Sequence, residues 1–167
     1  MLILDASTLI LIAKMEILTP FLKGISMDAA IPRAVERECC TEKKTLDALM
    51  IRKAIEESMV KVITVRNRSL VAKLQSDFGL GTGETEVIAA ALAEKSPLVG
   101  IDDKNGINAC KLLGEAFITA ASILIRSCEL GLISQADALA KLDLLAKYGR
   151  YKSSILEDVR ARLEACK

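Results

Sequence analysis

The sequence predicts an α/β protein built on a mostly parallel sheet with helices on both faces. Short aliphatic or β-branched runs, such as residues 2–5 (LILD) and 60–65 (VKVITV), alternate with longer segments of helical periodicity. Helices between successive strands are typical of parallel sheets that are buried on both faces. With 167 residues and no convincing linker, we expect one domain over residues 1–167.

The first half of the chain shows this alternation most clearly. Proline and glycine separate its segments, and Pro32 fits the first turn of a helix. The expected elements, in chain order, are a strand at 2–5, a helix at 8–17 capped by Ser7, a short segment broken by Pro20 and Gly24, a strand at 27–31, a helix opening at Pro32, an exposed helix at 43–57 and a strand at 60–65.

The second half begins with the same alternation and ends in helices. Glycines mark the expected helix ends. The expected elements are a helix at 69–78 ended by Gly79 and Gly81, an alanine-rich helix at 83–95, a strand at 97–101, a helix at 104–113 stopped by Gly114, a strand at 116–119, and helices at about 120–130, 135–148 and 153–166.

Composition excludes several classes of protein. Hydrophobic residues make up 51% of the chain, but its apolar runs fall short of the about 20 residues that a membrane span requires. The N-terminus has no basic leader and carries Asp5 inside its apolar run, so we expect a cytoplasmic protein without a signal peptide. The five cysteines are odd in number and lack C-x-x-C spacing, which favours reduced, structural thiols.

Four acidic residues stand where expected strands or helices turn toward one edge of the sheet: Asp5, Glu38, Glu84 and Asp102. Ligands of open parallel sheets bind beyond the carboxyl ends of the strands, where Asp5 and Asp102 are expected. Either aspartate alone is more simply a helix cap. Together, in a chain without histidine, the acids predict a site for Mg²⁺ or Mn²⁺, which prefer oxygen ligands.

The choice of acid within each helix follows from helical projection. At about 100° per residue, Glu84 falls near the apolar stripe that includes Val87 and Ile88, whereas Glu86 projects to the opposite side. We therefore expect Glu84 to be the ligand and Glu86 to be solvated or to complement the helix dipole. Glu38 is preferred to Glu36 because it shares a face with Val35.

Neighbouring polar residues leave alternatives open. Asp103 either binds a second ion or an ordered water, or caps the helix that follows. Ser7, Thr8 and Asn105 either orient a carboxylate or water, or act as helix caps.

The charge balance permits a nucleic-acid substrate without requiring one. The net charge is +1, but with Asp103 and the four acids above set aside, 17 acidic residues face 23 basic ones, which leaves +6. Aromatic residues are only 3% of the chain, so a base-stacking platform is not expected. Arg33 and Arg37, on the same helix as Glu38, are the first candidates for phosphate contacts.

The ordered segments LILDAST, IPRAVERE, GETEVIAAALA and PLVGIDDKNG resemble the PIN domain, in particular compact prokaryotic PIN-like proteins that include toxins of type II toxin–antitoxin pairs. The resemblance implies a three-layer α/β/α fold and a Mg²⁺- or Mn²⁺-dependent endoribonuclease. It implies an acidic set at Asp5, Glu38, Glu84 and Asp102, with Ser7 at the hydroxyl position after the first aspartate. It also implies an RNA substrate, a small antitoxin partner and a homodimer.

Two other functions remain open at this point. One is a PIN-like module that no longer cleaves and serves binding or assembly, which the altered spacing around the third acid favours. The other is a phosphotransfer domain built around Asp5. The second is less well supported, because Ser7 stands where a dehalogenase-type site needs another aspartate.

Overall fold

The computed structural model describes residues 1–41, 43–95 and 97–166 of the chain. Five strands and ten helices lie in these residues. In chain order they are β1 (Leu2–Leu4), α1 (Ala6–Lys14), α2 (Leu18–Gly24), β2 (Ala29–Pro32), α3 (Arg33–Cys40), α4 (Leu46–Glu56), β3 (Val60–Ile63), α5 (Arg68–Phe78), α6 (Thr82–Ala91), β4 (Leu98–Gly100), α7 (Lys104–Leu113), β5 (Phe117–Ile118), α8 (Ala120–Glu129), α9 (Gln135–Tyr148) and α10 (Ser153–Glu164).

The strands form one sheet in the order β3-β2-β1-β4-β5, and every pairing is parallel. The predicted α/β class is therefore confirmed. Leu4 of β1 lies opposite Gly100 of β4, so these two central strands end level with each other. Both strands are short and apolar, as expected of strands that are covered on each face.

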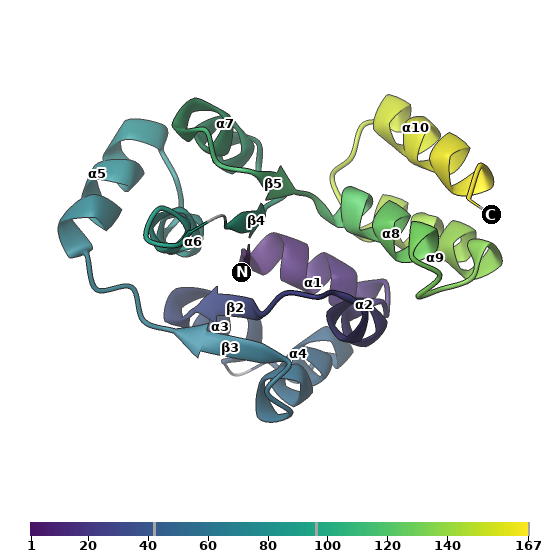
Figure 1. The fold of residues 1–167 in the computed structure, drawn as a ribbon, viewed down its shortest axis with the longest axis horizontal. Helices are drawn as coiled ribbons and strands as arrows, with labels where there is room; N and C mark the ends of the chain where they lie inside the picture. Colours follow the sequence, from purple (N-terminus) through teal and green to yellow (C-terminus); the bar gives the residue numbers. More distant parts are fainter. Residues whose placement is uncertain (42, 96, 167) are drawn as a thin grey trace.

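Helices cover both faces of the sheet (Figure 1). On one face α1 packs against α3, α4 and α8, while on the other α6 packs against β2, β1 and β4 and contacts α5 and α7. Helices α9 and α10 stack on α8, and Figure 1 shows this C-terminal group extending the first layer to one side. The three-layer α/β/α arrangement implied by the family resemblance is present.

Two local expectations in the first half of the chain were wrong. The segment with Pro20 and Gly24, for which no element was predicted, forms helix α2, since proline is tolerated in a first turn. Ser7 does not cap α1, because Asp5 takes that place with its side chain accepting a hydrogen bond from the Thr8 amide. The expected helix at 43–57 begins only at Leu46.

The core consists of aliphatic side chains from the central strands and the inner faces of α1, α6 and α8. Leu2, Ile3 and Leu4 are all fully buried. The five cysteines are free thiols. None of the helices in the described residues combines the length and hydropathy needed to cross a bilayer.

Candidate carboxylate site

Asp5 and Asp102 lie at the point of the sheet where the chain connections change direction. From β1 the chain passes to β2 on one side, and from β4 it passes to β5 on the other. In open parallel sheets this switch point leaves a crevice beyond the carboxyl ends of the two strands. Asp5 directly follows β1, and its amide donates to the Gly100 carbonyl at 2.8 Å. Asp102 follows β4 by two residues, so both aspartates emerge at this crevice.

Asp5 is almost fully buried, with 1% of its surface exposed. Its Oδ1 accepts from the Thr8 amide at 2.7 Å, and its Oδ2 accepts from Ser7 Oγ at 2.6 Å. Capping of α1 and membership of an acidic site were alternative explanations for this residue. The structure shows that Asp5 is the cap and that it also lies beside the end of β4, where Asp102 follows. Ser7 orients the carboxylate, which is one of the two roles expected for it.

Asp102 is held by donors from three parts of the chain. Its Oδ2 accepts from Thr8 Oγ1 at 2.7 Å and from the Ala120 amide at 2.9 Å, at the start of α8. Its Oδ1 accepts from the Tyr151 hydroxyl, in the connection between α9 and α10. Thr8 was considered for such a role from the sequence, but Tyr151 was missed. No local pattern marks Tyr151, because its partner lies 49 residues away.

The surroundings of both aspartates disfavour their ionised forms. Burial raises the pKa of Asp5 to about 6, with a further increase from the charge of Asp102, and the hydrogen bonds from Ser7 and Thr8 oppose this shift. Burial also raises the pKa of Asp102, against the hydrogen bonds from Thr8 and Ala120. No lysine or arginine in the described part of the chain forms an ion pair with either carboxylate.

Glu84 is half-buried near the N-terminus of α6 and forms a cap of its own helix. Its Oε2 accepts from the Gly81 amide at 2.9 Å. Burial raises the pKa of Glu84, and the nearby charges of Asp103 and Glu38 raise it further. Glu84 therefore lies near Asp103 and Glu38, whereas the expectation that it points into the core is wrong.

Glu86 contradicts the helical projection. It is 3% exposed, its Oε1 accepts from Arg68 at 2.7 Å, and its Oε2 accepts from the Ala34 amide at 3.3 Å. The projection failed because α6 is enclosed by the sheet and by α3, α5 and α7, so nearly every residue after Glu84 is buried and no solvent face exists. Glu86 joins α6 to α5 and to the start of α3.

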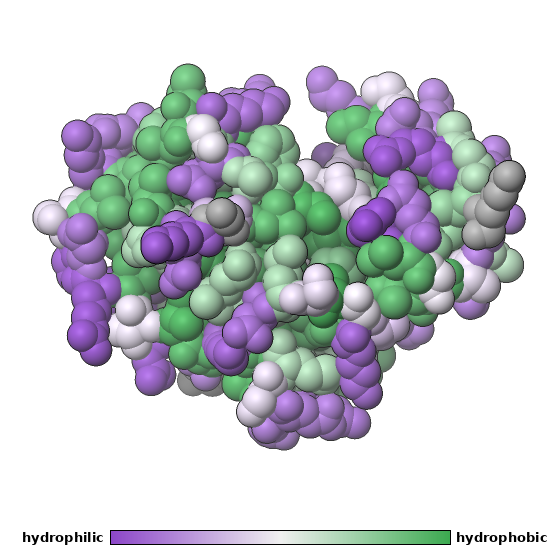
Figure 2. Space-filling model, in the orientation of Figure 1, coloured by the Kyte–Doolittle hydropathy of each residue, from purple (hydrophilic) through white to green (hydrophobic). Residues whose placement is uncertain are grey.

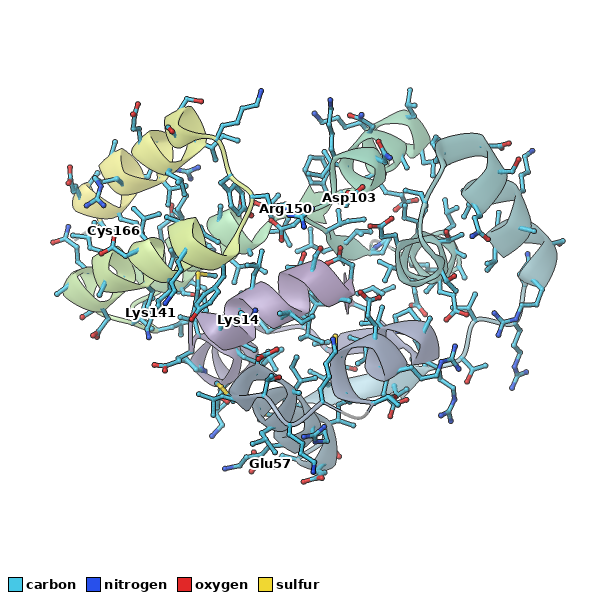
Figure 3. All side chains as sticks on the ribbon, turned by 180° about the vertical axis from the view of Figure 1, so that it is seen from behind. Lys14, Glu57, Asp103, Lys141, Arg150 and Cys166 are labelled. Atoms are coloured by element: carbon cyan, nitrogen blue, oxygen red, sulfur yellow. The ribbon has the colours of Figure 1, made fainter. Side chains whose placement is uncertain are left out.

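The remaining predicted residues lie around this group. Glu38 is exposed on α3 and reaches α6, where a Cβ placed on Gly83 would lie 3.2 Å from its Oε2. Asp103 caps α7, because its Oδ1 accepts from the amides of Asn105 at 2.7 Å and Gly106 at 3.1 Å. The side chain of Asn105 is exposed, and its amide serves only this cap. Figure 3 shows Asp103 and Arg150 on the same side of the molecule.

The acids form an inner pair, the buried Asp5 and the partly buried Asp102, and an outer set rather than one cluster. Asp5 and Asp102 are joined through Thr8, while Glu84, Asp103 and Glu38 influence each other from the neighbouring helix ends. Within residues 1–41, 43–95 and 97–166, no three acidic or cysteine side chains stand close enough together to hold one metal ion. The inner pair nevertheless fits a hard cation that keeps several waters and takes one or two protein carboxylates.

The comparisons with known proteins agree with this fold. A model of the DUF3368 family, a PIN domain, matches residues 1–165. The chain belongs to the PIN-domain family. Searches of curated proteins and of solved structures each returned no significant match. PIN domains have a nuclease-type fold and generally act as hydrolases of nucleic acid, so the family places this chain among nuclease-like proteins.

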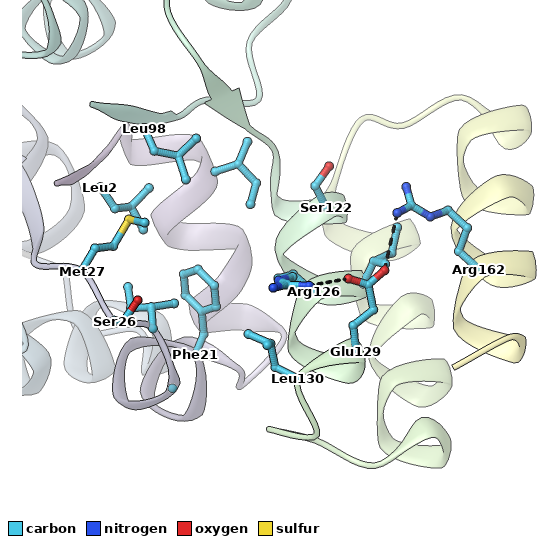
Figure 4. Close-up of a pocket in the computed structure, with 14 residues that line it drawn as sticks. Leu2, Phe21, Ser26, Met27, Leu98, Ser122, Arg126, Glu129, Leu130 and Arg162 are labelled. Atoms are coloured by element: carbon cyan, nitrogen blue, oxygen red, sulfur yellow. Dashed lines mark hydrogen bonds and ion pairs between the residues drawn. The ribbon is translucent and has the colours of Figure 1, made fainter. Parts of the chain in front are cut away.

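A cavity of about 460 Å³ lies at the opposite edge of the sheet of this PIN domain (Figure 4). Leu2 and Leu98, at the starts of β1 and β4, line it together with Phe21. Arg126 and Arg162 at its margin both pair with Glu129, at 3.1 and 3.7 Å. Figure 2 shows apolar side chains exposed near the middle of the face that Figure 1 presents. None of the predicted site residues lines this cavity, so the two edges of the PIN domain differ in chemistry.

The two arginines predicted to contact phosphate are both exposed on α3 of the PIN domain. Arg33 Nε donates to Thr64 Oγ1 at 3.3 Å, and its guanidinium lies 3.8 Å from Glu36. Such an exposed pair holds the side chain only weakly. Both arginines therefore remain available to a ligand that approaches the end of α3 near Glu38.

Proposed function

We propose that this PIN domain is a metal-dependent endoribonuclease that hydrolyses phosphodiester bonds of RNA. One observation carries the proposal: the buried carboxylate of Asp5 and the partly buried carboxylate of Asp102 lie together at the switch point without a cationic side chain paired to them in the described residues. Burying such charges is unfavourable unless a counter-charge is supplied. A divalent cation bound at this edge supplies it.

Mg²⁺ or Mn²⁺ is the cofactor that this donor set favours, because every candidate ligand is an oxygen and the chain has no histidine. When bound, such an ion lowers the pKa of a coordinated water and polarises a phosphoryl oxygen. Asp5 and Asp102 would hold it from inside. Glu38, Glu84 and Asp103 would complete the site from the ends of α3, α6 and α7 through water.

The protein's own groups then position the reacting parts. Ser7 and Thr8 fix the rotation of the Asp5 carboxylate, and Thr8 with the Ala120 amide fixes Asp102. The acids repel a phosphate backbone, so cations outside the pocket are needed to hold RNA. Arg33 and Arg37 on α3 are our candidates for this role.

The proposal extends to partners and location. Leu46 and Leu49 of α4 are 64% and 52% exposed, and apolar side chains of this kind suit a contact with a second copy or with a small antitoxin protein. Free thiols suit a reducing cytoplasm. Light scattering of the purified protein tests the dimer, and a monomer at micromolar concentration would contradict it.

A cleavage assay tests the activity. Asp5→Asn preserves the shape of the side chain and removes its charge, so it should abolish Mg²⁺- or Mn²⁺-stimulated cleavage of single-stranded RNA while the far-UV circular dichroism spectrum stays unchanged. Asp77→Asn makes the same chemical change at an exposed position of α5 and should cleave like the wild type. Equal activity of both variants would refute the mechanism.

A second function, an inactive PIN-like binding or assembly module, is favoured by the capping role of Glu84 and by the lack of a three-ligand group in the described residues. Calorimetry with Mn²⁺ separates the two. Binding that is lost in both Asp5→Asn and Asp102→Asn supports the nuclease, whereas a wild type that binds no Mn²⁺ supports the module.

A further inference from the structure

Tyr151 brings the C-terminal helices into the carboxylate site. It lies in the short connection between α9 and α10, and its hydroxyl donates to Asp102 Oδ1. The same hydroxyl oxygen accepts from the Ala121 amide at 3.3 Å. Because the oxygen receives the proton of Ala121, its own proton is directed to Asp102. The amide, the phenol and the carboxylate thus form a chain of hydrogen bonds at the N-terminus of α8.

The hydrogen-bond donors around Asp102 leave one acceptor position of its carboxylate unused. A carboxylate has about four acceptor positions, two on each oxygen. Thr8 and Ala120 take both positions on Oδ2, and Tyr151 takes one on Oδ1. The remaining position on Oδ1 is the one with which Asp102 can bind a cation. Of these three donors, Tyr151 alone acts on this oxygen.

The fold holds the Tyr151 ring tightly against the backbone that precedes it. A Cβ placed on Gly149 would lie 2.7 Å from Cδ2 of the ring and 2.8 Å from the Leu145 carbonyl oxygen. Both distances are too short for a real side chain, so the close approach requires glycine here. The ring is also partly buried. The hydroxyl is therefore placed by packing as well as by its hydrogen bonds.

We propose that Tyr151 is a positioning residue for divalent-cation binding: its hydroxyl orients Asp102 so that the remaining acceptor position of Oδ1 faces the Asp5 side of the crevice. The inference rests on the proposed function, since it assumes that Asp102 is a ligand. It assigns to the C-terminal helices a direct part in the site. Donors that orient a ligating carboxylate typically change metal affinity 10- to 100-fold when removed.

Calorimetric titration of the full chain with Mn²⁺ tests this inference. Tyr151→Phe removes only the hydroxyl and should weaken Mn²⁺ binding about tenfold. Tyr148→Phe is the matched control, because it makes the same change at the only other tyrosine. The Tyr148 ring is 42% exposed and faces Lys14 and Lys147, and its variant should bind Mn²⁺ like the wild type.

Two further measurements separate positioning from a structural role. The urea midpoint of Tyr151→Phe should stay close to that of Tyr148→Phe, so that a change in affinity cannot be attributed to unfolding. Gly149→Ala keeps the hydroxyl but displaces the ring, and it should also weaken binding. Mn²⁺ affinity of Tyr151→Phe within twofold of the wild type would overturn the inference, as would an equal reduction in the Tyr148 control.

The outcome also distinguishes this inference from the function on which it rests. If the wild type binds Mn²⁺, Asp102→Asn does not, and Tyr151→Phe binds like the wild type, only the role of Tyr151 is overturned. If the wild type binds no Mn²⁺, the proposed function and the role of Tyr151 are overturned together.

Discussion

Thr8 Oγ1 donates a hydrogen bond of 2.7 Å to Asp102 Oδ2, while the Thr8 amide donates one of the same length to Asp5 Oδ1. A single fully buried residue in the first turn of α1 therefore connects the ends of β1 and β4. The hydroxyl reaches across 94 residues of sequence to fix the second aspartate. Thr8 therefore supplies one hydrogen bond to each aspartate, from its backbone amide to Asp5 and from its side chain to Asp102.

Thr8→Val should damage the site without changing the volume of the side chain. It leaves the amide bond to Asp5 intact and removes the hydroxyl bond to a charged group, so we expect a loss of about 2 kcal/mol in the free energy of unfolding. Mn²⁺ affinity should fall about tenfold. Urea denaturation and calorimetry measure the two effects.

Thr8→Ser is the control for this change, because it keeps the hydroxyl and removes only a buried methyl group. It should cost about 1 kcal/mol of stability and leave Mn²⁺ affinity near the wild-type value. Equal Mn²⁺ binding by the valine and serine variants would show that the hydroxyl has no part in holding Asp102 for the metal.

The raised pKa of Asp5 predicts how stability depends on pH without metal. The pKa is about 6 in the folded protein and 3.8 in the unfolded chain, so between these values the folded state binds one more proton. This contribution to stability is fully present below pH 3.8 and is lost as the pH rises through 6. Asp5→Asn removes it. The variant should therefore gain up to about 3 kcal/mol relative to the wild type between about pH 4 and pH 7.

Urea denaturation in the presence of a chelator measures this gain. The raised pKa values of Asp102 and Glu84 act in the same direction but are retained in the variant, so the difference isolates Asp5. A difference between Asp5→Asn and the wild type that does not vary with pH would contradict the raised pKa of Asp5.

Two substitutions of Glu84 separate capping from metal binding. Glu84→Gln keeps an oxygen for the Gly81 amide and removes the charge, so stability should stay within about 0.5 kcal/mol while Mn²⁺ affinity falls. Glu84→Ala removes both the capping oxygen and the charge, so it should lower Mn²⁺ affinity and also lower the free energy of unfolding by about 1 kcal/mol. Thermal denaturation and calorimetry test these expectations. Unchanged Mn²⁺ affinity in both variants would restrict Glu84 to the cap.

Arg68 should matter to stability more than its exposure suggests. Its guanidinium is the only cationic partner of the buried Glu86 in the described residues, so Arg68→Ala leaves a buried charge unpaired and should cost about 2 kcal/mol. Adding Glu86→Gln should recover part of this stability, because a neutral amide needs no counter-charge.

Arg126→Ala is the comparison for Arg68→Ala. It removes an arginine of similar exposure that pairs with Glu129, whose side chain is 38% exposed, and should cost no more than about 1 kcal/mol. Urea denaturation midpoints of the two variants, measured under the same conditions, compare the two losses of stability. A destabilisation by Arg68→Ala as small as that by Arg126→Ala would argue that Glu86 is satisfied by the Ala34 amide alone.

Arg33 and Arg37 should hold RNA through its phosphates. The double alanine variant should weaken binding of single-stranded RNA and reduce the slope of log K against log salt by about 1.4, which is about 0.7 for each phosphate that is no longer neutralised. Fluorescence anisotropy over a salt series measures both. Alanine at Arg126 and Arg162, beside the cavity at the opposite edge, removes the same charge and should leave the slope unchanged. Identical slopes for both double variants would place the RNA elsewhere.

The sequence by itself determined the alternation of strands and helices, because apolar periodicity and the capping residues act over only a few positions. Gly79, Gly114 and Ser134 stand at the helix boundaries that their chemistry predicts. The placement of Asp5 and Asp102 beyond two parallel strands could also be predicted, since each follows a short apolar run.

Only the tertiary structure decided which acids lie inside and what holds them. A helical projection separates two sides only when one of them faces solvent, and α6 is enclosed. Glu86 is therefore buried and pairs with the exposed Arg68, while Glu84 turns back to its own helix end. The contact of Tyr151 with Asp102 depends on how α8, α9 and α10 pack. Packing between distant segments depends on the whole core, so it cannot be predicted from any short stretch of sequence.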